Sequence, residues 1–117
     1  MDQREDGIEE LKKKLRHYSE QDISFNDPHF TQQLSLREGN KNEVIHALLN
    51  PERLVYSYQD KGIRGDTIHC LHFHISTTRT MRLPVIFDKD GRKGLYILTY
   101  IMRHRFWQNM VRTRGKK

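Results

Sequence analysis

Apolar and polar residues alternate along much of the second half of the chain, and this alternation is typical of β-strands. Three consecutive strands are predicted at Asp66–Ser76, Arg79–Phe87 and Leu95–Met102, because β-branched and aromatic residues cluster there and turn residues bracket each cluster. Residues 88–94 contain two glycines that can adopt positive φ, which favours a tight reversal of the chain. We therefore expect the last two strands to form an antiparallel hairpin.

The same alternation assigns two faces to each predicted strand. The apolar faces, expected to form the core, consist of Leu71, Phe73 and Ile75 in the first strand and Met81, Leu83, Val85 and Phe87 in the second. The other face carries Cys70, His72 and His74, with Arg82 on the corresponding side of the second strand. Pro84 lacks a backbone donor, so its strand is predicted to lie at an edge, to be bulged, or to donate only from its other residues.

Apolar spacings of three and four residues predict helices in the first half of the chain. Ile8, Leu11, Leu15 and Tyr18 would line one stripe of an amphipathic helix at 7–20. Further elements are predicted as a strand at Asp22–Asn26, a helix from near Pro28 to Gly39-Asn40, a helix at Lys41–Leu49, a strand at Arg53–Gln59 and a helix at His104–Thr113. Asp27 and Asn40 are suited to cap the two middle helices.

These elements predict one α+β domain over residues 1–117, in which a small antiparallel sheet packs against two or three helices. Its parts are an N-terminal helix at 7–20, a helical pair plus sheet at 23–104, and a flexible basic tail at 112–117. Charged residues make up 31% of the chain and the mean hydropathy is −0.87. No apolar run would span a bilayer and no secretion signal precedes the first helix, so we expect a cytoplasmic protein without membrane contacts.

Positive charge is concentrated in the C-terminal half. Residues 67–117 contain eleven Lys and Arg against two Asp and Glu, whereas residues 1–22 and 23–66 carry net charges of −2 and −1. This segregation favours a polyanionic partner, RNA or another nucleic acid first, with a solvated basic surface as the alternative. The residues expected to contact phosphate are Arg37, Arg79, Arg105, Arg112, Arg114, Lys116 and Lys117.

The histidines and arginines of this half suit metal-independent RNA cleavage. That reaction requires activation of the ribose 2′-hydroxyl, charge stabilisation at phosphorus and protonation of the leaving oxygen. Imidazole can perform the first and third tasks and guanidinium the second. The candidate catalytic residues are His72, His74, Arg82, Arg103 and His104. The alternative is that these histidines are structural or simply lie at the surface.

A metal site is the other chemistry that some of these residue types allow. His72 and His74 share a predicted face with Cys70, and His-x-His on a strand can hold zinc. No acidic residue or second cysteine lies close in sequence to complete such a site, so we expect neither a metal nor another cofactor. As the single cysteine, Cys70 excludes an internal disulfide and is expected to pack rather than react.

The middle of the chain resembles a known family. The residues that carry the resemblance are Ile23-Ser24-Phe25, His29-Phe30, Gln33-Leu34, Arg37, Val44, Leu48 and Asn50-Pro51, followed by several strands. Over residues 23–102 this pattern resembles the DUF4258 family, which has a His-Ala-x-x-Arg-Met-x-x-Arg-Gly-Ile run and is compared with the RelE/ParE toxin fold. His29 and Arg37 match that run by spacing, whereas Phe30 replaces its alanine and Gln33 its first arginine.

A shorter resemblance points the same way. Arg53-Leu54-Val55-Tyr56 is similar to a strand of RelE/YoeB-type mRNA interferases. Both resemblances imply a helical pair packed on an antiparallel sheet. The leading hypothesis is a RelE/ParE-like, toxin-type domain that binds RNA and acts as a metal-independent endoribonuclease, with an antitoxin or other protein partner. The alternative is a non-catalytic nucleic-acid-binding or protein-interaction module.

Overall fold

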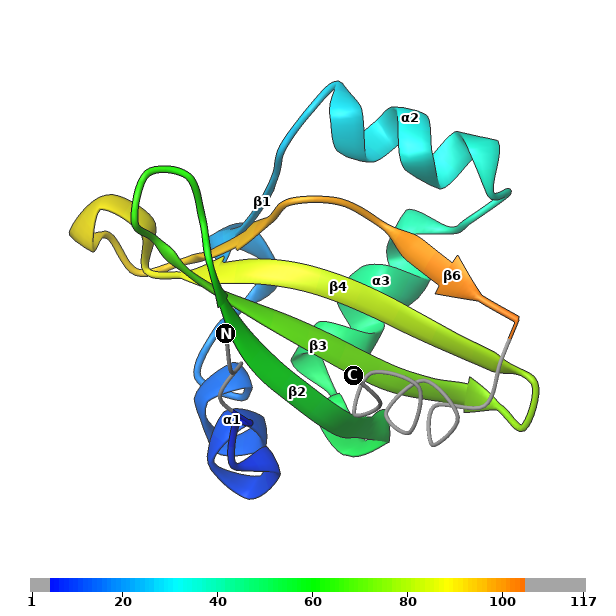
Figure 1. Cartoon of the computed structure of the whole chain (residues 1–117), viewed down its shortest axis with the longest axis horizontal. Coiled ribbons are helices and arrows are strands. Elements are labelled where there is room, and N and C mark those ends of the chain that lie inside the picture. The colour runs from blue at the N-terminus through cyan, green and yellow to red at the C-terminus, as the bar shows by residue number, and fades with distance from the viewer. Residues whose placement is uncertain (1–4, 105–117) are drawn as a thin grey trace.

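The computed structural model describes residues 5–104, and Figure 1 shows the arrangement of its helices and strands. In chain order the elements are α1 (Ile8–Leu15), η1 (Glu20–Asp22), β1 (Ile23–Phe25), α2 (His29–Leu36), α3 (Lys41–Leu49), η2 (Pro51–Arg53), β2 (Leu54–Lys61), β3 (Thr67–Ser76), β4 (Arg79–Phe87), η3 (Lys89–Gly91), β5 (Leu95–Ile97) and β6 (Ile101–Arg103). The expected α+β class, with a sheet packed against helices, is confirmed. The predicted C-terminal helix at 104–113 and the tail at 112–117 lie outside the described residues, apart from His104.

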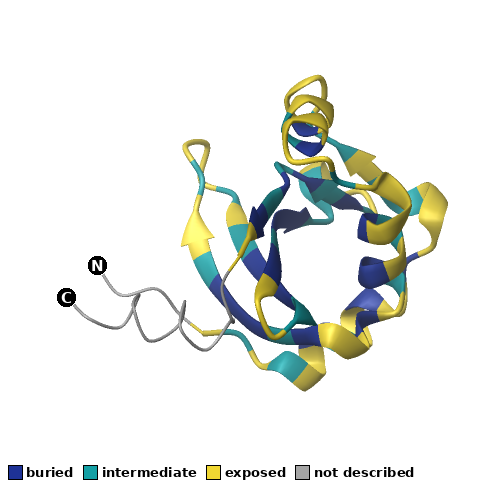
Figure 2. Cartoon of the chain, turned by 90° about the vertical axis from the view of Figure 1, so that its right-hand side faces the viewer, coloured by how far each residue is buried: buried dark blue, intermediate teal, exposed yellow. Residues whose placement is uncertain are grey.

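The strands form one mostly antiparallel open sheet with the order β1-β5-β4-β3-β2. β5 and β6 pair with successive parts of the same edge of β4, so the second follows the first along it. β1 lies parallel to β5, with Ile23 opposite Leu95. The sheet curves, and the helices close its concave side around buried residues (Figure 2). Within the described chain no helix is long and apolar enough to cross a membrane.

The core lies between the helices and the predicted apolar face of the sheet. It contains Leu11, Leu15 and Tyr18 from the α1 region, Phe30 and Leu34 from α2, Val44 and Leu48 from α3, and Leu71, Phe73, Met81, Leu83 and Val85 from β3 and β4. Ile75 and Phe87 pack against it while partly exposed. The face assignment made from alternation is therefore confirmed. Tyr18 reaches the core although α1 ends at Leu15, five residues before the predicted end.

The predicted hairpin between the last two strands is confirmed, but the final strand is broken. Phe87 pairs with Leu95 and Val85 with Ile97, after which residues 98–100 leave the ladder until β6 begins. Pro84 lies opposite Cys70 in a central strand, so of the three alternatives the edge is wrong and a strand that donates only from its other residues fits. On its other side, Pro84 faces the segment that connects β5 and β6. The Pro84 carbonyl accepts a hydrogen bond from the Leu98 N–H of that segment at 2.9 Å. The missing proline donor is thus tolerated because no regular ladder partner faces it.

The predicted cap of α3 is confirmed, whereas the N-cap of α2 is Pro28 and not the predicted Asp27. Asn40 accepts hydrogen bonds from the N–H groups of Asn42 and Glu43, at 2.8 and 3.4 Å. Asp27 accepts from the Thr31 N–H at 2.9 Å, although Pro28 occupies the position that flanks the first residue of α2. Asn40 therefore fixes where α3 starts, as predicted, whereas Asp27 bonds to the first turn of α2 from the position before its N-cap residue, Pro28.

Candidate nucleic-acid interface

His72 and Arg82 lie opposite each other on β3 and β4, on the face of the sheet away from the core. The imidazole contacts the rings of Tyr56 and Tyr58, with centroids 5.2 and 5.8 Å away, and its Nδ1 lies 3.0 Å from the Cys70 carbonyl. Arg82 donates from Nη2 to the Tyr58 hydroxyl over 2.8 Å. We call these five residues the outer cluster. Since His72 is 3% exposed, the cluster is a packed arrangement of rings and one guanidinium.

Two other candidate catalytic residues share this outer face. The strand register places Thr80 between His74 of β3 and Arg103 of β6. Arg103 is exposed and His74 is half-buried. The structure thus brings His72 and Arg82 into direct cross-strand contact and sets His74 and Arg103 farther along the same face.

His104 lines a different site, a hollow between the C-terminal end of α2, the start of β4 and the end of β6. The hollow has a volume of about 450 Å³ and is lined by Leu36, Arg37, Glu38, Arg79, Met102 and His104. We call it the cationic hollow. Arg37, Arg79 and His104 are exposed, whereas Met102 belongs to the core. The five candidate catalytic residues are therefore divided between two sides of the sheet. His104 lines the hollow together with two of the candidate phosphate contacts, Arg37 and Arg79.

The link between α2 and α3 shapes one wall of the cationic hollow. After α2 the chain turns through Glu38, whose φ is +54°, and the Gly39 N–H donates to the Leu34 carbonyl over 2.7 Å. A Cβ on Gly39 would lie 2.6 Å from Leu34 Cδ1 and 2.8 Å from Tyr100 Cζ, closer than real contacts allow. Gly39 is therefore required by close packing, because only a residue without a side chain allows the link to pack directly against Tyr100.

Tyr100 extends from the break between β5 and β6 beneath this link. Its side chain is 1% exposed and packs edge-on against Phe30. Burial raises the pKa of Tyr100, and the nearby Glu43 raises it further, while Arg79 and Arg37 act in the opposite direction. The hydroxyl therefore lies within electrostatic reach of both arginines of the cationic hollow.

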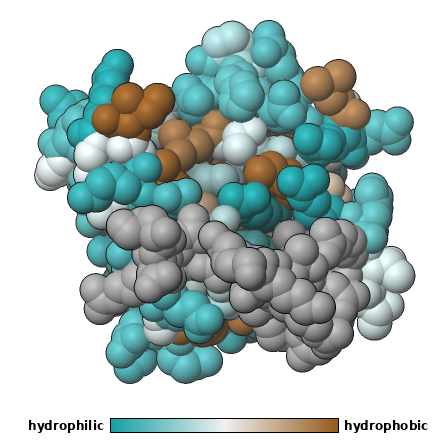
Figure 3. Space-filling view, in the orientation of Figure 1, coloured by the Kyte–Doolittle hydropathy of each residue, from teal (hydrophilic) through white to brown (hydrophobic). Residues whose placement is uncertain are grey.

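The charged groups of the cationic hollow have no ionic partners among the described residues. Ion pairs within residues 5–104 join Lys12 to Glu9, Lys14 to Asp88, His69 to Asp6, Lys89 to Asp90 and Lys93 to Asp22. Arg37, Glu38, Arg79 and His104 are not among them. Leu36, beside these groups, is 77% exposed, although hydrophilic residues cover most of the described face seen in Figure 3. The hollow thus offers free cations next to an exposed apolar side chain.

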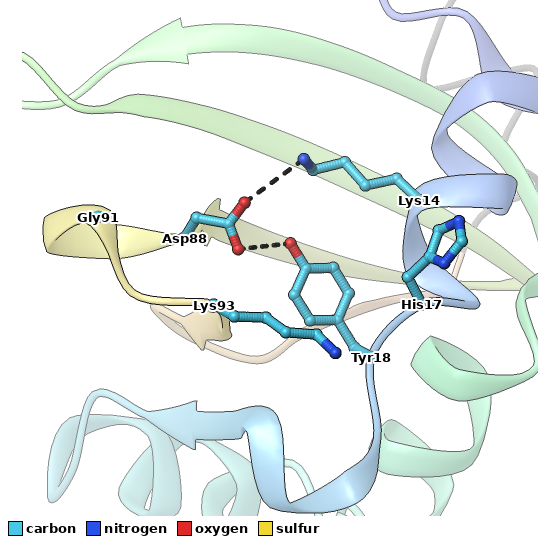
Figure 4. Close-up of a pocket in the computed structure, with 6 residues that line it drawn as sticks. All are labelled: Lys14, His17, Tyr18, Asp88, Gly91 and Lys93. Carbon is cyan, nitrogen blue, oxygen red and sulfur yellow. Dashed lines mark hydrogen bonds and ion pairs between the residues drawn. The ribbon is translucent and has the colours of Figure 1, made fainter.

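A second hollow, about 370 Å³ in volume, lies between the end of α1 and the turn from β4 to β5 (Figure 4). It is lined by Lys14, His17, Tyr18, Asp88, Gly91 and Lys93, and we call it the hairpin hollow. Asp88 accepts from the Tyr18 hydroxyl at 2.7 Å and lies 3.6 Å from Lys14 Nζ (Figure 4). Lys93 pairs with Asp22 at 3.7 Å. Both lysines of this hollow are thus already neutralised.

The hydrogen bond between Tyr18 and Asp88 also shifts the pKa values of both groups. It lowers the pKa of Asp88 below its usual value, with help from the Gly94 N–H and Lys14. Burial raises the pKa of Tyr18, and the bond to Asp88 raises it further. The carboxylate and the neutral phenol are therefore the forms that this end of the sheet stabilises.

Asp6 forms a similar polar cluster, which is connected to the hairpin hollow through Phe87, because the Phe87 ring contacts both His69 and Tyr18. Its carboxylate accepts hydrogen bonds from Ser57 Oγ at 2.6 Å and Gln59 Nε2 at 2.8 Å, and lies 3.0 Å from His69 Nδ1. Burial acts to raise the pKa of Asp6, but these three partners outweigh it and the pKa is lowered. Serine, aspartate and histidine are all present, yet the serine bonds to the carboxylate rather than to the imidazole, as a nucleophile would require. The cluster is structural: it holds the start of the chain against β2.

Sequence reasoning named Arg37, Arg79 and His104 but missed the two other hollow-lining residues at the end of α2, Leu36 and Glu38. A glutamate followed by glycine at a helix end gave no sign that the glutamate would take the left-handed conformation. The remaining predicted phosphate contacts, Arg105, Arg112, Arg114, Lys116 and Lys117, lie outside the described residues. His29 is exposed at the opposite end of α2 from Arg37.

Among residues 5–104, no three His, Cys, Asp or Glu side chains gather as a metal site would require. Comparisons with known proteins add no relative: no family model matches the chain, and neither a curated protein nor a solved structure is significantly similar to it.

Proposed function

We propose that this protein binds RNA through the cationic hollow and cleaves it there without a metal ion, as a toxin-type domain of the RelE/ParE-like kind. The observation that carries the proposal is that Arg37, Arg79 and His104 converge on one hollow as exposed groups without an acidic partner among the described residues. Guanidinium groups bind phosphate oxygens through paired hydrogen bonds, and an unpaired cation gains most from such an anion. The net charge of +6 favours the approach of a polyanion.

The fold supports the same interpretation. The helical pair α2–α3 is followed by the antiparallel strands β2, β3, β4 and β5, with β1 before the pair. A helical pair packed on an antiparallel sheet is what the resemblance to DUF4258 and RelE/ParE proteins implies. In a protein of this kind we expect an antitoxin, or another protein partner, to control the activity.

A non-catalytic RNA-binding module is the second candidate, favoured by one observation. A histidine-only mechanism needs two imidazoles at one site. Of the three candidate histidines, His104 lines the cationic hollow, whereas His72 and His74 lie on the outer face. Binding would need only the arginines. The two candidates differ in whether RNA is cut after it is bound.

Binding is tested by titrating labelled single-stranded RNA at several salt concentrations. Exchanging both Arg37 and Arg79 for alanine removes two charge-assisted contacts of about 1.5 kcal/mol each, so affinity should fall on the order of 100-fold. The slope of log K against log salt should become shallower by about 1.4, at about 0.7 for each lost phosphate contact. Arg64→Ala, at the exposed β2–β3 turn, is the matched control and should leave affinity within about twofold. An equal loss in the control, or no association at low salt, would rule the interface out.

Cleavage is tested on the same RNA with a chelator present. The proposed enzyme produces fragments ending in a 2′,3′-cyclic phosphate, whereas a binding module leaves the RNA intact. Intact RNA after prolonged incubation with protein that binds it would establish the second candidate.

A further inference from the structure

Of the described residues that line the cationic hollow, only Glu38 is acidic. Its side chain is exposed and forms no ion pair within residues 5–104, although Arg37, Arg79 and His104 line the same space. A carboxylate repels the phosphates of an approaching polyanion, so it lowers the affinity of a phosphate site. A hollow that bound phosphate alone would bind it better without Glu38.

The backbone conformation of Glu38 is also unfavourable. Its φ of +54° lies in the left-handed region, which glycine usually occupies after a helix. The chain does have a glycine here, but one position later, where Leu34 and Tyr100 leave no room for a Cβ. Strained residues of this kind are concentrated at functional sites. The charge and the conformation of Glu38 therefore both indicate a role in what the hollow binds.

The cationic hollow offers a surface for each part of a nucleotide. Its volume of about 450 Å³ lies within the range of roughly 300–1,000 Å³ that is usual for small-molecule sites. Arg37 and Arg79 suit phosphate oxygens. Leu36 is 77% exposed and provides an apolar surface for the flat face of a base. The Glu38 carboxylate, which can only accept hydrogen bonds when ionised, suits the donors on the edge of a base.

We propose that the cationic hollow holds a guanine nucleotide of single-stranded RNA and that Glu38 determines this specificity; the inference rests on the RNA binding proposed above. The Watson–Crick edge of guanine carries two adjacent donors, N1–H and the 2-amino group, which match the two oxygens of one carboxylate. Adenine and cytosine place an amino donor beside a ring-nitrogen acceptor, and uracil places its N–H between two carbonyl oxygens. On these edges one carboxylate oxygen meets an acceptor and is repelled.

Glu38 thus selects by repulsion as well as by attraction. Its charge weakens the binding of every RNA, and guanine recovers the loss because it donates two charge-assisted hydrogen bonds to the carboxylate. Arg37 and Arg79 contact phosphates, which are the same in every sequence and carry no base preference. The arginines therefore provide affinity and Glu38 provides specificity.

The direct test measures the binding of short single-stranded RNAs that differ only in the central base of an otherwise uridine sequence. Riboses with 2′-fluoro groups keep the RNA intact, because no 2′-hydroxyl is present to attack phosphorus. The RNA with a central guanine should bind about 10- to 100-fold more tightly than those with adenine, cytosine or uracil, as expected for a bidentate contact. Equal affinities, or a preference for another base, would overturn the inference.

Glu38→Gln distinguishes base recognition from a structural role. The amide cannot accept from both donors, so affinity for the guanine RNA should fall about 10-fold or more. Affinity for the all-uridine RNA should stay equal or rise by up to about threefold, because a negative charge is lost. Glu20→Gln, at an exposed carboxylate on η1, is the matched control and should keep the wild-type preference. A parallel loss of affinity for both RNAs in Glu38→Gln would overturn the role of Glu38.

Inosine tests the contact at the level of one hydrogen bond. It is guanosine without the 2-amino group, so it leaves the Glu38 carboxylate a single donor. Wild-type protein should bind the inosine RNA about 5- to 10-fold more weakly than the guanine RNA, and Glu38→Gln should bind the two within about twofold of each other. Equal binding of guanine and inosine by wild type would overturn the assigned contact.

Failure of this inference is distinguishable from failure of the proposed function. RNA that binds through Arg37 and Arg79 without a base preference overturns only the role of Glu38. Absence of binding for every RNA at low salt overturns the interface and guanine recognition together. A guanine preference that Glu38→Gln abolishes supports the inference whether or not the protein also cuts RNA.

Discussion

The two hollows lie at opposite ends of β4 and differ in how their charges are satisfied. Arg79 begins β4 at the cationic hollow, and Asp88 follows its last residue at the hairpin hollow. In the hairpin hollow, Lys14 and Lys93 each have a carboxylate within 4 Å. In the cationic hollow, the groups of both signs lack such partners among the described residues. Satisfied groups hold a fold together, whereas unsatisfied ones are available to a ligand.

This difference divides the expected effects of substitution. Changes near the hairpin hollow should lower the free energy of unfolding and leave RNA binding intact. Changes in the cationic hollow should impair binding or cleavage and leave stability unchanged or higher. Four measurements test that division.

The largest effect on stability is expected from Asp6→Ala, in the polar cluster that Phe87 connects to the hairpin hollow. It leaves the donors of Ser57, Gln59 and His69 without their acceptor, which should lower the free energy of unfolding by about 2–4 kcal/mol in urea denaturation. Glu5→Ala, at the exposed preceding position, should change it by less than about 0.5 kcal/mol. RNA affinity of folded Asp6→Ala protein should equal that of wild type. A parallel loss of affinity would contradict the division between residues that stabilise the fold and residues that bind RNA.

Tyr18→Phe should have the next largest effect. It removes the 2.7 Å hydrogen bond to Asp88 while keeping the ring in the core, so about 1–2 kcal/mol of stability should be lost. Thermal and urea denaturation measure the change. In a double-mutant cycle with Asp88→Asn the two losses should be less than additive, because both substitutions act on one interaction. Strict additivity would show that the bond contributes nothing.

Glu38→Gly, in the cationic hollow, should change the free energy of unfolding in the opposite direction. Glycine relieves the left-handed strain, so the free energy of unfolding should increase by about 0.5–1 kcal/mol even though a side chain is lost. Glu20→Gly, which lies outside any left-handed position, should show no such gain. A destabilised Glu38→Gly protein would mean that the glutamate serves the fold.

The smallest effect concerns the pH dependence of stability at Asp88. Its pKa is lowered in the folded state, so its contribution is fully present above the unfolded value of 3.8 and is lost as pH falls through the lower folded value. Because the side chain is 41% exposed, solvent screening should keep this contribution below about 1 kcal/mol. Unfolding free energies measured from pH 2 to 7 should fall less steeply on the acid side for Asp88→Asn than for wild type. Identical profiles would contradict the role of the Tyr18 bond.

The fold could be predicted as far as local patterns reach. Strand alternation gave the faces of β3 and β4, and the cap residue Asn40 gave the start of α3. The pattern of Leu95–Met102 is apolar except for Thr99, so it could not reveal that Leu98 to Tyr100 leave the ladder. The parallel pairing of β1 with β5 joins distant segments, and no local feature of either strand specifies it.

The candidate site was predictable in its residue types but not in its grouping. Arg37, Arg79 and His104 come from α2, β4 and the end of β6, and only the packing of α2 against the sheet brings them together. His72 and Arg82 did group as alternation predicts, but in a buried cluster. Glu38 was missed because the helix was predicted to run to Gly39-Asn40, whereas α2 ends at Leu36 and Glu38 takes the left-handed conformation.

The parallel pairing of β1 with β5 also bears on how the chain is completed during synthesis. Ile23–Phe25 leave the ribosome long before Leu95–Ile97 exist, so the first strand emerges without the neighbour that it will finally have. Until then the helical pair and the hairpin of β2 and β3, whose contacts are closer in sequence, are the parts able to form. Of the described strands, β5 is therefore the one that gives β1 its partner, and β6, which follows it, brings Met102 and His104 to the cationic hollow.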